Sequence, residues 1–403
     1  MAINYNQFFD FYKKLIAINS ISSDTPSEDI SNEAFIDLLK DFLEKLDFKT
    51  KKILVKSNPQ KFNLIASFIP KDYPLSQISR TINDKETLVS AFEGGIAFSG
   101  HSDTVPTDES KWNTDPFNAE VIDNKLYGLG VIDMKGFFAF VCYKLLHLDF
   151  SKVTKPIYVL ATADEETSMF GAEEMLKYFF DKPDLIVIGE PTSMEPIIMH
   201  KGHVVQTITV KGGSGHSSNP DSAPNAIKIM HEIIDALLKL EKTLKTKYVE
   251  KLFPISYPTM NLGMISGGDA PNRICEECSL TFDIRPIPGV SSKICTQETY
   301  NALDEILSKY PNMITITKPY NPTEPFDGKI SQELQDFLEK ISEHKPLAVN
   351  YATEATYFQN IAPTIVMGAG DISMAHQPNE YLDLNEVEPM MNILEKLINK
   401  FAM

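Results

Sequence analysis

Residues 156–166 read PIYVLATADEE, an apolar run that ends in acidic side chains. The run IYVLATA is typical of a buried strand, and Glu165 and Glu166 follow shortly after it. In open α/β sheets, ligands bind beyond the carboxyl ends of the strands. This stretch therefore predicts an α/β fold with a ligand site at the edge of the sheet where these two carboxylates lie.

Four other apolar runs also end in residues that can bind a metal ion. His101 and Asp103 follow IAFSG, Asp133 follows LYGLGVI, Glu190 follows DLIVIG, and His376 follows PTIVMGAGDISMA. Together with Glu166, these segments offer two imidazoles and several carboxylates but no thiolate. That mixture suits a catalytic zinc or a similar divalent ion rather than a structural zinc knuckle. We therefore predict that five segments deliver side chains to one metal-binding rim.

The charges of these side chains favour two metal ions over one. Two Zn²⁺ ions carry four positive charges, while Asp133, Glu166, Glu190 and one bridging hydroxide would supply four negative ones. A dinuclear site would therefore be locally neutral. A single ion would leave an excess of negative charge.

Two further residues of these segments have predicted roles beside the metal. Glu165 and Glu166 are adjacent, so their side chains point in different directions, and one can take a proton from water while the other binds metal. His101 and Asp103 stand two apart on extended chain, so their side chains point the same way. Asp103 can therefore accept a hydrogen bond from the imidazole of His101 and orient it.

Each of these motifs has a simpler interpretation when it is taken alone. The triplet HSD could be a surface turn, Asp133 could be the N-cap of the apolar helix that follows it, and the paired glutamates could be solvated acids that open a helix. Glu190 could be an ordinary strand-end carboxylate and His376 a surface histidine. The recurrence of such residues after apolar runs favours the metal site.

Composition limits the possible partners. The chain has 403 residues and a formal net charge of -17, and its 38 Lys and Arg residues are dispersed, so we expect no nucleic-acid partner. No run approaches the roughly 18 apolar residues that a membrane span needs, so we expect no membrane role. Four cysteines and the lack of a secretion signal favour a reducing, cytoplasmic compartment.

The length predicts two domains, because a single core seldom organises so long a chain. From residue 203 the expected order of elements is β-α-β-β-α-β, the order of a ferredoxin-like α+β unit. The predicted metal ligands lie on both sides of this unit, at residues 101–190 and 376. We therefore expect an α/β domain with a mixed sheet flanked by helices, formed by residues 1–200 and 315–403, and an inserted domain at 201–314.

Three residues of the inserted unit are candidates for contacts with a substrate. His216 lies on the glycine-rich loop GGSGHSSNP ahead of a helix, where a mobile donor could stabilise an oxyanion. Asn272 and Arg285 lie at strand ends, and a guanidinium is a good bidentate partner for a carboxylate. A polar loop histidine and an exposed strand-end arginine are the simpler interpretations.

Eight blocks, in this order along nearly the whole chain, resemble those of the co-catalytic di-zinc aminoacylase and carboxypeptidase family. The blocks are SGHSDTVP, YGLGVIDMKGFFAF, LATADEETSMFGAEE, IGEPTS, HKGH, GGSGHSSNP, DIRPIPG and GAGDISMAHQPNEYL. The resemblance implies a zinc-peptidase-like catalytic domain. It also implies that the inserted domain serves as a lid and as the contact surface of a homodimer. The excursion at residues 70–94 is longer than is usual in this family and could be a surface excursion or a lid.

The resemblance also implies roles for the predicted site residues. His101, Asp133 and Glu190 would hold one Zn²⁺, and Glu166, Asp133 and His376 would hold the other, with Co²⁺ or Mn²⁺ as possible substitutes. Asp133 would thus bridge the two ions, and its peptide bond to Met134 would be cis. Glu165 would be the general base, and His216 would reach the oxyanion from a partner subunit.

The implied activity is hydrolysis of a small N-acyl amino acid. The blocks most resemble members that remove an acetyl group from the α-nitrogen of an amino acid with a side-chain ammonium group. Arg285 and Asn272 would then bind the α-carboxylate, and Glu354 would bind the ammonium. The alternatives are a hydrolase with the same metals but another acyl group or a dipeptide as substrate, and a non-catalytic metal-binding protein on the same scaffold.

Overall fold

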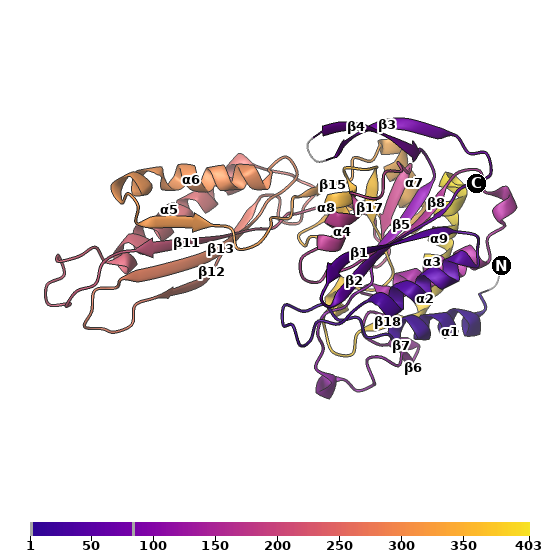
Figure 1. The fold of residues 1–403 in the computed structure, drawn as a ribbon, viewed down its shortest axis with the longest axis horizontal. Helices are drawn as coiled ribbons and strands as arrows, with labels where there is room; N and C mark the ends of the chain where they lie inside the picture. The colour runs from indigo at the N-terminus through magenta and orange to yellow at the C-terminus, as the bar shows by residue number, and fades with distance from the viewer. Residues whose placement is uncertain (1–2, 83–84) are drawn as a thin grey trace. The chain divides into compact units, whose positions relative to one another are not determined.

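The computed structural model describes residues 3–82 and 85–403, and Figure 1 shows their fold. The chain divides into two compact units. The first unit contains the chain up to Ile198, Gly328–Leu347 and Thr353–Met403, and the second contains Met199–Asp327 and Ala348–Ala352. The predicted insertion thus begins within two residues of the observed boundary, but it ends later than residue 314.

The first unit is built on a mixed β-sheet, as predicted. Its strands, in spatial order, are β1 (Lys49–Ser57), β2 (Gln60–Phe68), β8 (Ile157–Thr162), β5 (Ile96–His101), β9 (Leu185–Ile188), β17 (Thr364–Val366) and β10 (Ile197–His200). β5 runs parallel to β8 and β9, and β9 runs parallel to β17, whereas β1, β2 and β10 pair antiparallel. At its end, β10 also pairs with β15 (Phe326–Asp327) and β16 (Leu347–Val349).

The central strands of this sheet are buried along their whole length. Every residue of β5, β8 and β9 is buried, which explains why these strands are continuous apolar runs rather than alternating ones. The helices of this unit are α1 (Tyr5–Ile16), α2 (Glu33–Glu44), α3 (Lys135–Leu146), α4 (Phe170–Met175), α7 (Gln332–Ser342), α8 (Ala355–Phe358) and α9 (Val387–Phe401). α3 contacts α1, α9 and β5, so it is apolar almost all round.

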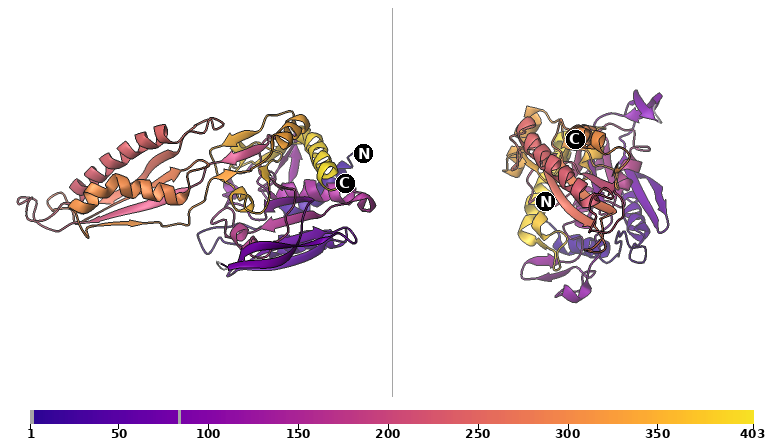
Figure 2. Two further views of the ribbon diagram at one scale, coloured as in Figure 1. Left: turned by 90° about the horizontal axis from the view of Figure 1, so that it is seen from above. Right: turned by 90° about the vertical axis from the view of Figure 1, so that its left-hand side faces the viewer.

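The first unit also contains smaller elements outside the large sheet. β18 (Tyr381–Asp383), β7 (Lys125–Tyr127) and β6 (Glu120–Ile122) form a three-stranded sheet. The 3-10 helices are η1 (Glu109–Lys111), η2 (Phe150–Lys152), η3 (Ile372–Met374) and η4 (Leu384–Glu386). The excursion predicted at 70–94 is a hairpin of β3 (Leu75–Ile82) and β4 (Lys85–Phe92), whose tip at 83–84 lies outside the described residues. The hairpin forms a sheet of its own, apart from the large one (Figure 2).

The second unit confirms the predicted β-α-β-β-α-β order. Its elements are β11 (Val204–Lys211), α5 (Ala226–Lys247), β12 (Thr259–Gly267), β13 (Glu277–Arg285), α6 (Ser292–Lys309) and β14 (Ile314–Thr317). The strands form an antiparallel sheet in the order β12-β13-β11-β14, and α5 and α6 lie side by side on it (Figure 1). β11 and β13 alternate buried and partly buried residues because only one face of this sheet is covered by helices.

The second unit extends past residue 314 because the strand there belongs to its sheet. Ile314–Thr317 pairs with β11 over four residues, and Thr323 pairs with His203 in an isolated bridge. These contacts keep the chain in the second unit as far as Asp327. Separately, none of the described helices combines the length and the apolar character needed to cross a membrane.

Candidate metal centre

Three parallel strands bring predicted ligands to the same edge of the large sheet. His101 is the last residue of β5 and pairs with Thr162, the last residue of β8. Glu165 and Glu166 follow β8, and Glu190 follows β9, which pairs with β5 up to Ser99 and Ile188. The matched register places these side chains together, as expected for the carboxyl ends of parallel strands.

Two loops complete the group. Asp133 lies in the loop between β7 and α3, and its peptide bond to Met134 is cis, as the family resemblance implied. His376 lies on the loop that follows η3. Asp133 is buried, whereas the side chain of His376 is exposed.

Among the described residues, three sets of donor atoms lie close enough to hold a metal ion, and two of these sets share Asp133. His101, Asp133 and Glu190 can each place one ligand atom within 4.8 Å of the others, and so can Asp133, Glu166 and His376. His101 Nε2 lies 3.0 Å from Asp133 Oδ1, and His376 Nε2 lies 3.2 Å from Asp133 Oδ2. The two oxygens of one carboxylate thus face different imidazoles, which is the arrangement that a bridging ligand requires.

Other contacts show how well these side chains fit divalent cations. His376 Nε2 is 2.9 Å from Glu166 Oε2, while Glu166 Oε1 is buried without a hydrogen-bond partner among the described residues. His101 Nε2 is 4.0 Å from Glu190 Oε2. Donors that share one zinc ion at about 2.0–2.2 Å each must lie within roughly 4 Å of one another. The nitrogen and oxygen donors present here therefore fit two such ions.

The structure alters the predicted role of the Asp103 side chain. The imidazole Nδ1 of His101 lies 3.0 Å from the main-chain oxygen of Asp103, but 3.7 Å from its carboxylate. The carboxylate instead accepts the backbone N–H groups of Glu165 at 3.4 Å and Glu166 at 3.3 Å. Asp103 therefore orients His101 through its backbone and shapes the turn that carries the two glutamates.

The pKa values of Glu165 and His376 are raised, so both groups bind a proton more readily than usual. Burial raises the pKa of Glu165 well above its usual value, and the nearby carboxylates of Glu190 and Glu166 raise it further although His101 opposes them. Hydrogen bonds to two carboxylates raise the pKa of His376 to about 11. A divalent cation would satisfy the same demand for positive charge.

Glu354 also lies deep in the first unit. Its side chain is fully buried, and its Oε2 is 2.7 Å from the hydroxyl of Thr162 at the end of β8. Its other oxygen, Oε1, has no hydrogen-bond partner among the described residues. Burial raises the pKa of Glu354 to about 7. The carboxyl group thus has one oxygen available for a further donor.

The three predicted substrate-binding residues of the inserted unit all lie in the second unit. The exposed His216 bridges to Arg273, and the backbone N–H of Ser217 donates to the oxygen of Asn272 at 3.0 Å, so His216 and Asn272 lie on neighbouring segments. The Arg285 guanidinium Nε donates to Asp283 at 3.1 Å. That these three residues act at the metal centre remains a prediction.

Lys61 and Glu380 are buried charged residues beside the site that the sequence patterns did not indicate. Lys61 is fully buried, and its ammonium lies 2.9 Å from Asp29 and 3.5 Å from Asp164, the residue before Glu165. Glu380 is buried and accepts backbone N–H groups from the loop of Asp133. The available signals were a lysine at the start of the mainly apolar stretch KFNLIASF and an acidic residue in the block AHQPNEYL.

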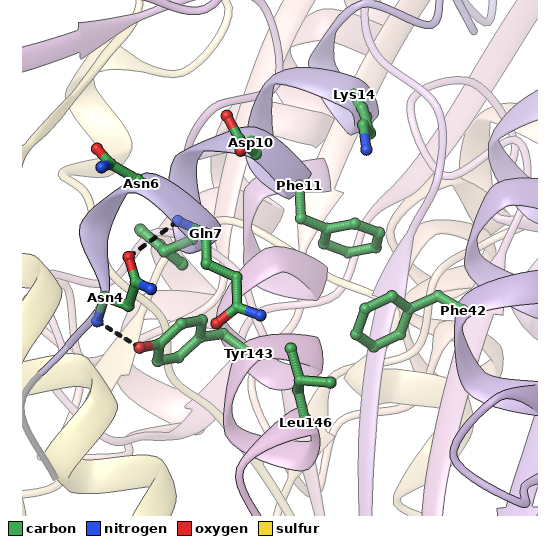
Figure 3. A pocket seen from close by; sticks show the side chains of 10 residues that line it. Asn4, Asn6, Gln7, Asp10, Phe11, Lys14, Phe42, Tyr143 and Leu146 are labelled. Atoms are coloured by element: carbon green, nitrogen blue, oxygen red, sulfur yellow. Dashed lines mark hydrogen bonds between the residues drawn. The ribbon is translucent and has the colours of Figure 1, made fainter.

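A cavity elsewhere in the first unit is lined by none of the predicted metal-binding, catalytic or substrate-binding residues. It has a volume of about 520 Å³ and is lined by residues of α1, α2 and α3, among them Phe11, Phe42 and Tyr143 (Figure 3). The hydroxyl of Tyr143 accepts the backbone N–H of Asn4 at 2.6 Å. The rings of Phe11 and Phe42 lie 4.5 Å apart. This cavity is a surface groove between helices rather than part of the metal centre.

Comparison with known proteins agrees with this geometry. Residues 97–400 match the model of peptidase family M20/M25/M40. An acetylornithine deacetylase from Photorhabdus laumondii subsp. laumondii is 41% identical over 403 residues, which cover 100% of this chain and 99% of the relative.

Solved structures share the fold at low sequence identity. The aminopeptidase PepT from Bacillus cereus has a TM-score of 0.72 and 16% identity, with 99% of each chain covered. The YXEP protein of Bacillus subtilis, described as a dinuclear metal-binding peptidase from the M20 family, has a TM-score of 0.64 and 11% identity, with 98% of this chain and 97% of that chain covered. With the family match and the full-length relative, these findings show that the chain belongs to peptidase family M20/M25/M40 and is a hydrolase of amide bonds.

Proposed function

We propose that this hydrolase removes the acetyl group from N2-acetyl-L-ornithine and releases L-ornithine and acetate. The observation that carries the proposal is the pair of donor sets that share Asp133. The substrate is supported by the relative named acetylornithine deacetylase, which is 41% identical over 403 residues. The reaction would serve arginine biosynthesis. A cytoplasmic setting is supported by the four cysteines, which are free thiols.

The proposed cofactor is a pair of Zn²⁺ ions, which Co²⁺ or Mn²⁺ could replace. His101, Asp133 and Glu190 would hold one ion, and Asp133, Glu166 and His376 would hold the other. Support comes from the mixture of imidazole and carboxylate donors and from the description of the YXEP protein as a dinuclear metal-binding peptidase. When bound, such ions polarise the amide carbonyl and lower the pKa of water.

In this proposal, Glu165 moves the proton of the reaction. It accepts a proton from the water that attacks the acetyl carbonyl, and it returns a proton to the α-nitrogen when the amide bond breaks. Burial raises its pKa, which brings a carboxylate closer to the range where it can both accept and donate near neutral pH. Asp103 supports this role because it holds the backbone N–H of Glu165.

Residues of both units would bind the substrate. Arg285 and Asn272 are proposed partners of the α-carboxylate, and Glu354 of the side-chain ammonium. Oε1 of Glu354 has no hydrogen-bond partner among the described residues, which supports the last assignment because an ammonium group can donate three hydrogen bonds. His216 would donate to the developing oxyanion.

We also propose a homodimer that forms through the second unit. β12 is at the edge of its sheet, and its side chains Met264 and Ile265 are 72% and 60% exposed. Exposed apolar edge strands are usually paired or covered in stable proteins. His216 lies in the same unit, so a dimer could bring it to the metal centre of the partner subunit.

The substrate and metal assignments predict zinc-dependent release of ornithine. Protein stripped with a chelator should not hydrolyse acetylornithine, and two equivalents of Zn²⁺ should restore turnover because both donor sets must be filled. Steady-state ornithine release checks this. Hydrolysis of succinyl amino acids or dipeptides but not of acetylornithine would keep the metal site and overturn the substrate. Unchanged activity after metal removal would overturn both assignments.

Replacement of the general base should separate catalysis from metal binding. We expect Glu165→Gln to keep two metal ions per chain and to lose at least about 100-fold in kcat, because the amide cannot accept a proton from water. Metal analysis and kinetics on the same sample measure both properties. Glu120→Gln, which changes an exposed strand residue, should retain activity. An active Glu165→Gln enzyme would remove Glu165 from the base role.

Glu354 should determine selectivity in a pH-dependent way. Its pKa is raised to about 7, so the ionised fraction increases as the pH rises from 6 to 8, while the substrate ammonium stays charged. The ratio of kcat/KM for acetylornithine to that for an uncharged acetylated amino acid should therefore rise over this range. Glu354→Gln should lower this ratio and remove its pH dependence. Equal losses on both substrates would contradict the assignment.

Complementation between inactive variants tests the dimer and His216 together. In a mixed dimer of His216→Ala and Glu165→Gln chains, one site regains both residues if His216 acts across the interface. Random mixing should then restore about a quarter of wild-type activity, since half of the dimers are mixed and each has one working site. If coexpressed chains gave no more activity than the separate variants, His216 would not act from the partner subunit.

A further inference from the structure

We propose that Glu380 is a positioning residue that aims the Asp133 carboxylate by holding the backbone of residues 128–133. The inference rests on the proposed role of Asp133 as a bridging metal ligand. It adds a role for a residue outside the proposed ligand and substrate-binding sets, acting through hydrogen bonds to the main chain.

Glu380 makes four hydrogen bonds of ordinary length with this loop. Its Oε2 accepts the backbone N–H of Gly130 at 2.9 Å, and its Oε1 accepts those of Ile132 at 2.8 Å and Asp133 at 3.2 Å. Its main-chain oxygen accepts the N–H of Gly128 at 3.1 Å. One residue thus binds four of the six N–H groups between 128 and 133.

The two remaining N–H groups of the loop also have hydrogen-bond partners. The N–H of Leu129 donates to the oxygen of Pro116 at 2.8 Å, and that of Val131 donates to Gly128 at 3.3 Å. The buried hydroxyl of Tyr12 donates to the oxygen of Val131. The loop has no regular secondary structure, so side chains and distant backbone atoms take the place of a helix or strand partner.

The chemistry of the contact requires a carboxylate. All three partners of the Glu380 side chain are donors, and an ionised carboxylate has two oxygens that accept and no group that donates. A glutamine would turn an amide N–H toward at least one backbone N–H. Because Glu380 is only 1% exposed, water cannot easily replace the lost contact.

The position of Glu380 connects the two sides of the metal centre. It lies four residues after His376 and directly precedes β18, which pairs with β7 just before the Asp133 loop. Asp133 must place Oδ1 toward His101 and Oδ2 toward His376 at the same time. A shift of its backbone would disturb both contacts, so the clamp by Glu380 should act on both metal-binding sets.

Metal affinity is the measurement that tests this role. We expect Glu380→Gln to bind Zn²⁺ about 10- to 100-fold more weakly than the wild type in chelator competition, and to show an altered absorption spectrum with Co²⁺. Glu380→Asp, which keeps the charge but shortens the reach, should lose less affinity, and it replaces the glutamine variant if that variant does not fold. Substrate is not needed for these measurements.

A matched variant separates positioning from general stability. Asp181 also accepts a backbone N–H in the first unit, from Phe92 at 2.8 Å, on a segment without proposed ligands. Asp181→Asn should leave Zn²⁺ affinity and the Co²⁺ spectrum unchanged even if it lowers the melting temperature. If Glu380→Gln likewise lowered only the melting temperature, the positioning role would be overturned.

These metal-binding measurements test Glu380 separately from the proposed substrate. A wild-type protein that binds two ions but does not hydrolyse acetylornithine would leave the role of Glu380 supported by the affinity loss. A wild-type protein that binds neither Zn²⁺ nor Co²⁺ would overturn the role of Glu380 together with the metal centre.

Discussion

Repulsion among clustered carboxylates is the constraint on which the rest of this structure depends. Asp133, Glu166 and Glu190 offer oxygen atoms in one small region where water has little access. Anions this close together are unstable unless cations or hydrogen-bond donors compensate them. The imidazoles of His101 and His376 supply part of this compensation, and metal ions would supply the remainder. The apolar core around β5, β8 and β9 provides the stability that lets such a site persist.

Two kinds of support hold the ligands in place. His101 lies at a strand end whose backbone pairs with Thr162, and Glu190 follows the end of β9 by two residues. Glu165 and Glu166 lie on the turn after β8, where the Asp103 carboxylate accepts their backbone N–H groups. Asp133 and His376 lie on loops, so their positions depend on contacts such as those of Glu380 with the Asp133 loop. The site therefore combines a rigid edge with loops whose main-chain groups are bound by side chains from elsewhere in the chain.

Sequence patterns predicted the second unit well because its secondary structure is amphipathic. The alternation along β13 and the long helix α5 follow directly from burial on one face, so the order of elements is confirmed. The predicted end of the inserted domain, residue 314, was too early. The strand β14 belongs to this domain because it pairs with β11, about a hundred positions earlier in the chain. Asp103 was assigned to the imidazole of His101 from spacing alone, whereas its carboxylate holds the backbone of Glu165 and Glu166. Spacing shows which way a side chain points but not which distant donor reaches it.

The sequence by itself determined the fold class, the candidate ligands and the order of the inserted unit. Each of these depends on local properties, namely apolar runs, their polar ends and the periodicity of burial. Only the tertiary structure decided that one carboxylate, Asp133, faces both His101 and His376, and that Lys61 and Glu380 are buried beside the turns that carry the ligands. These contacts join segments that are far apart in the chain. Their geometry is set by strand register and core packing, which no short stretch of sequence contains.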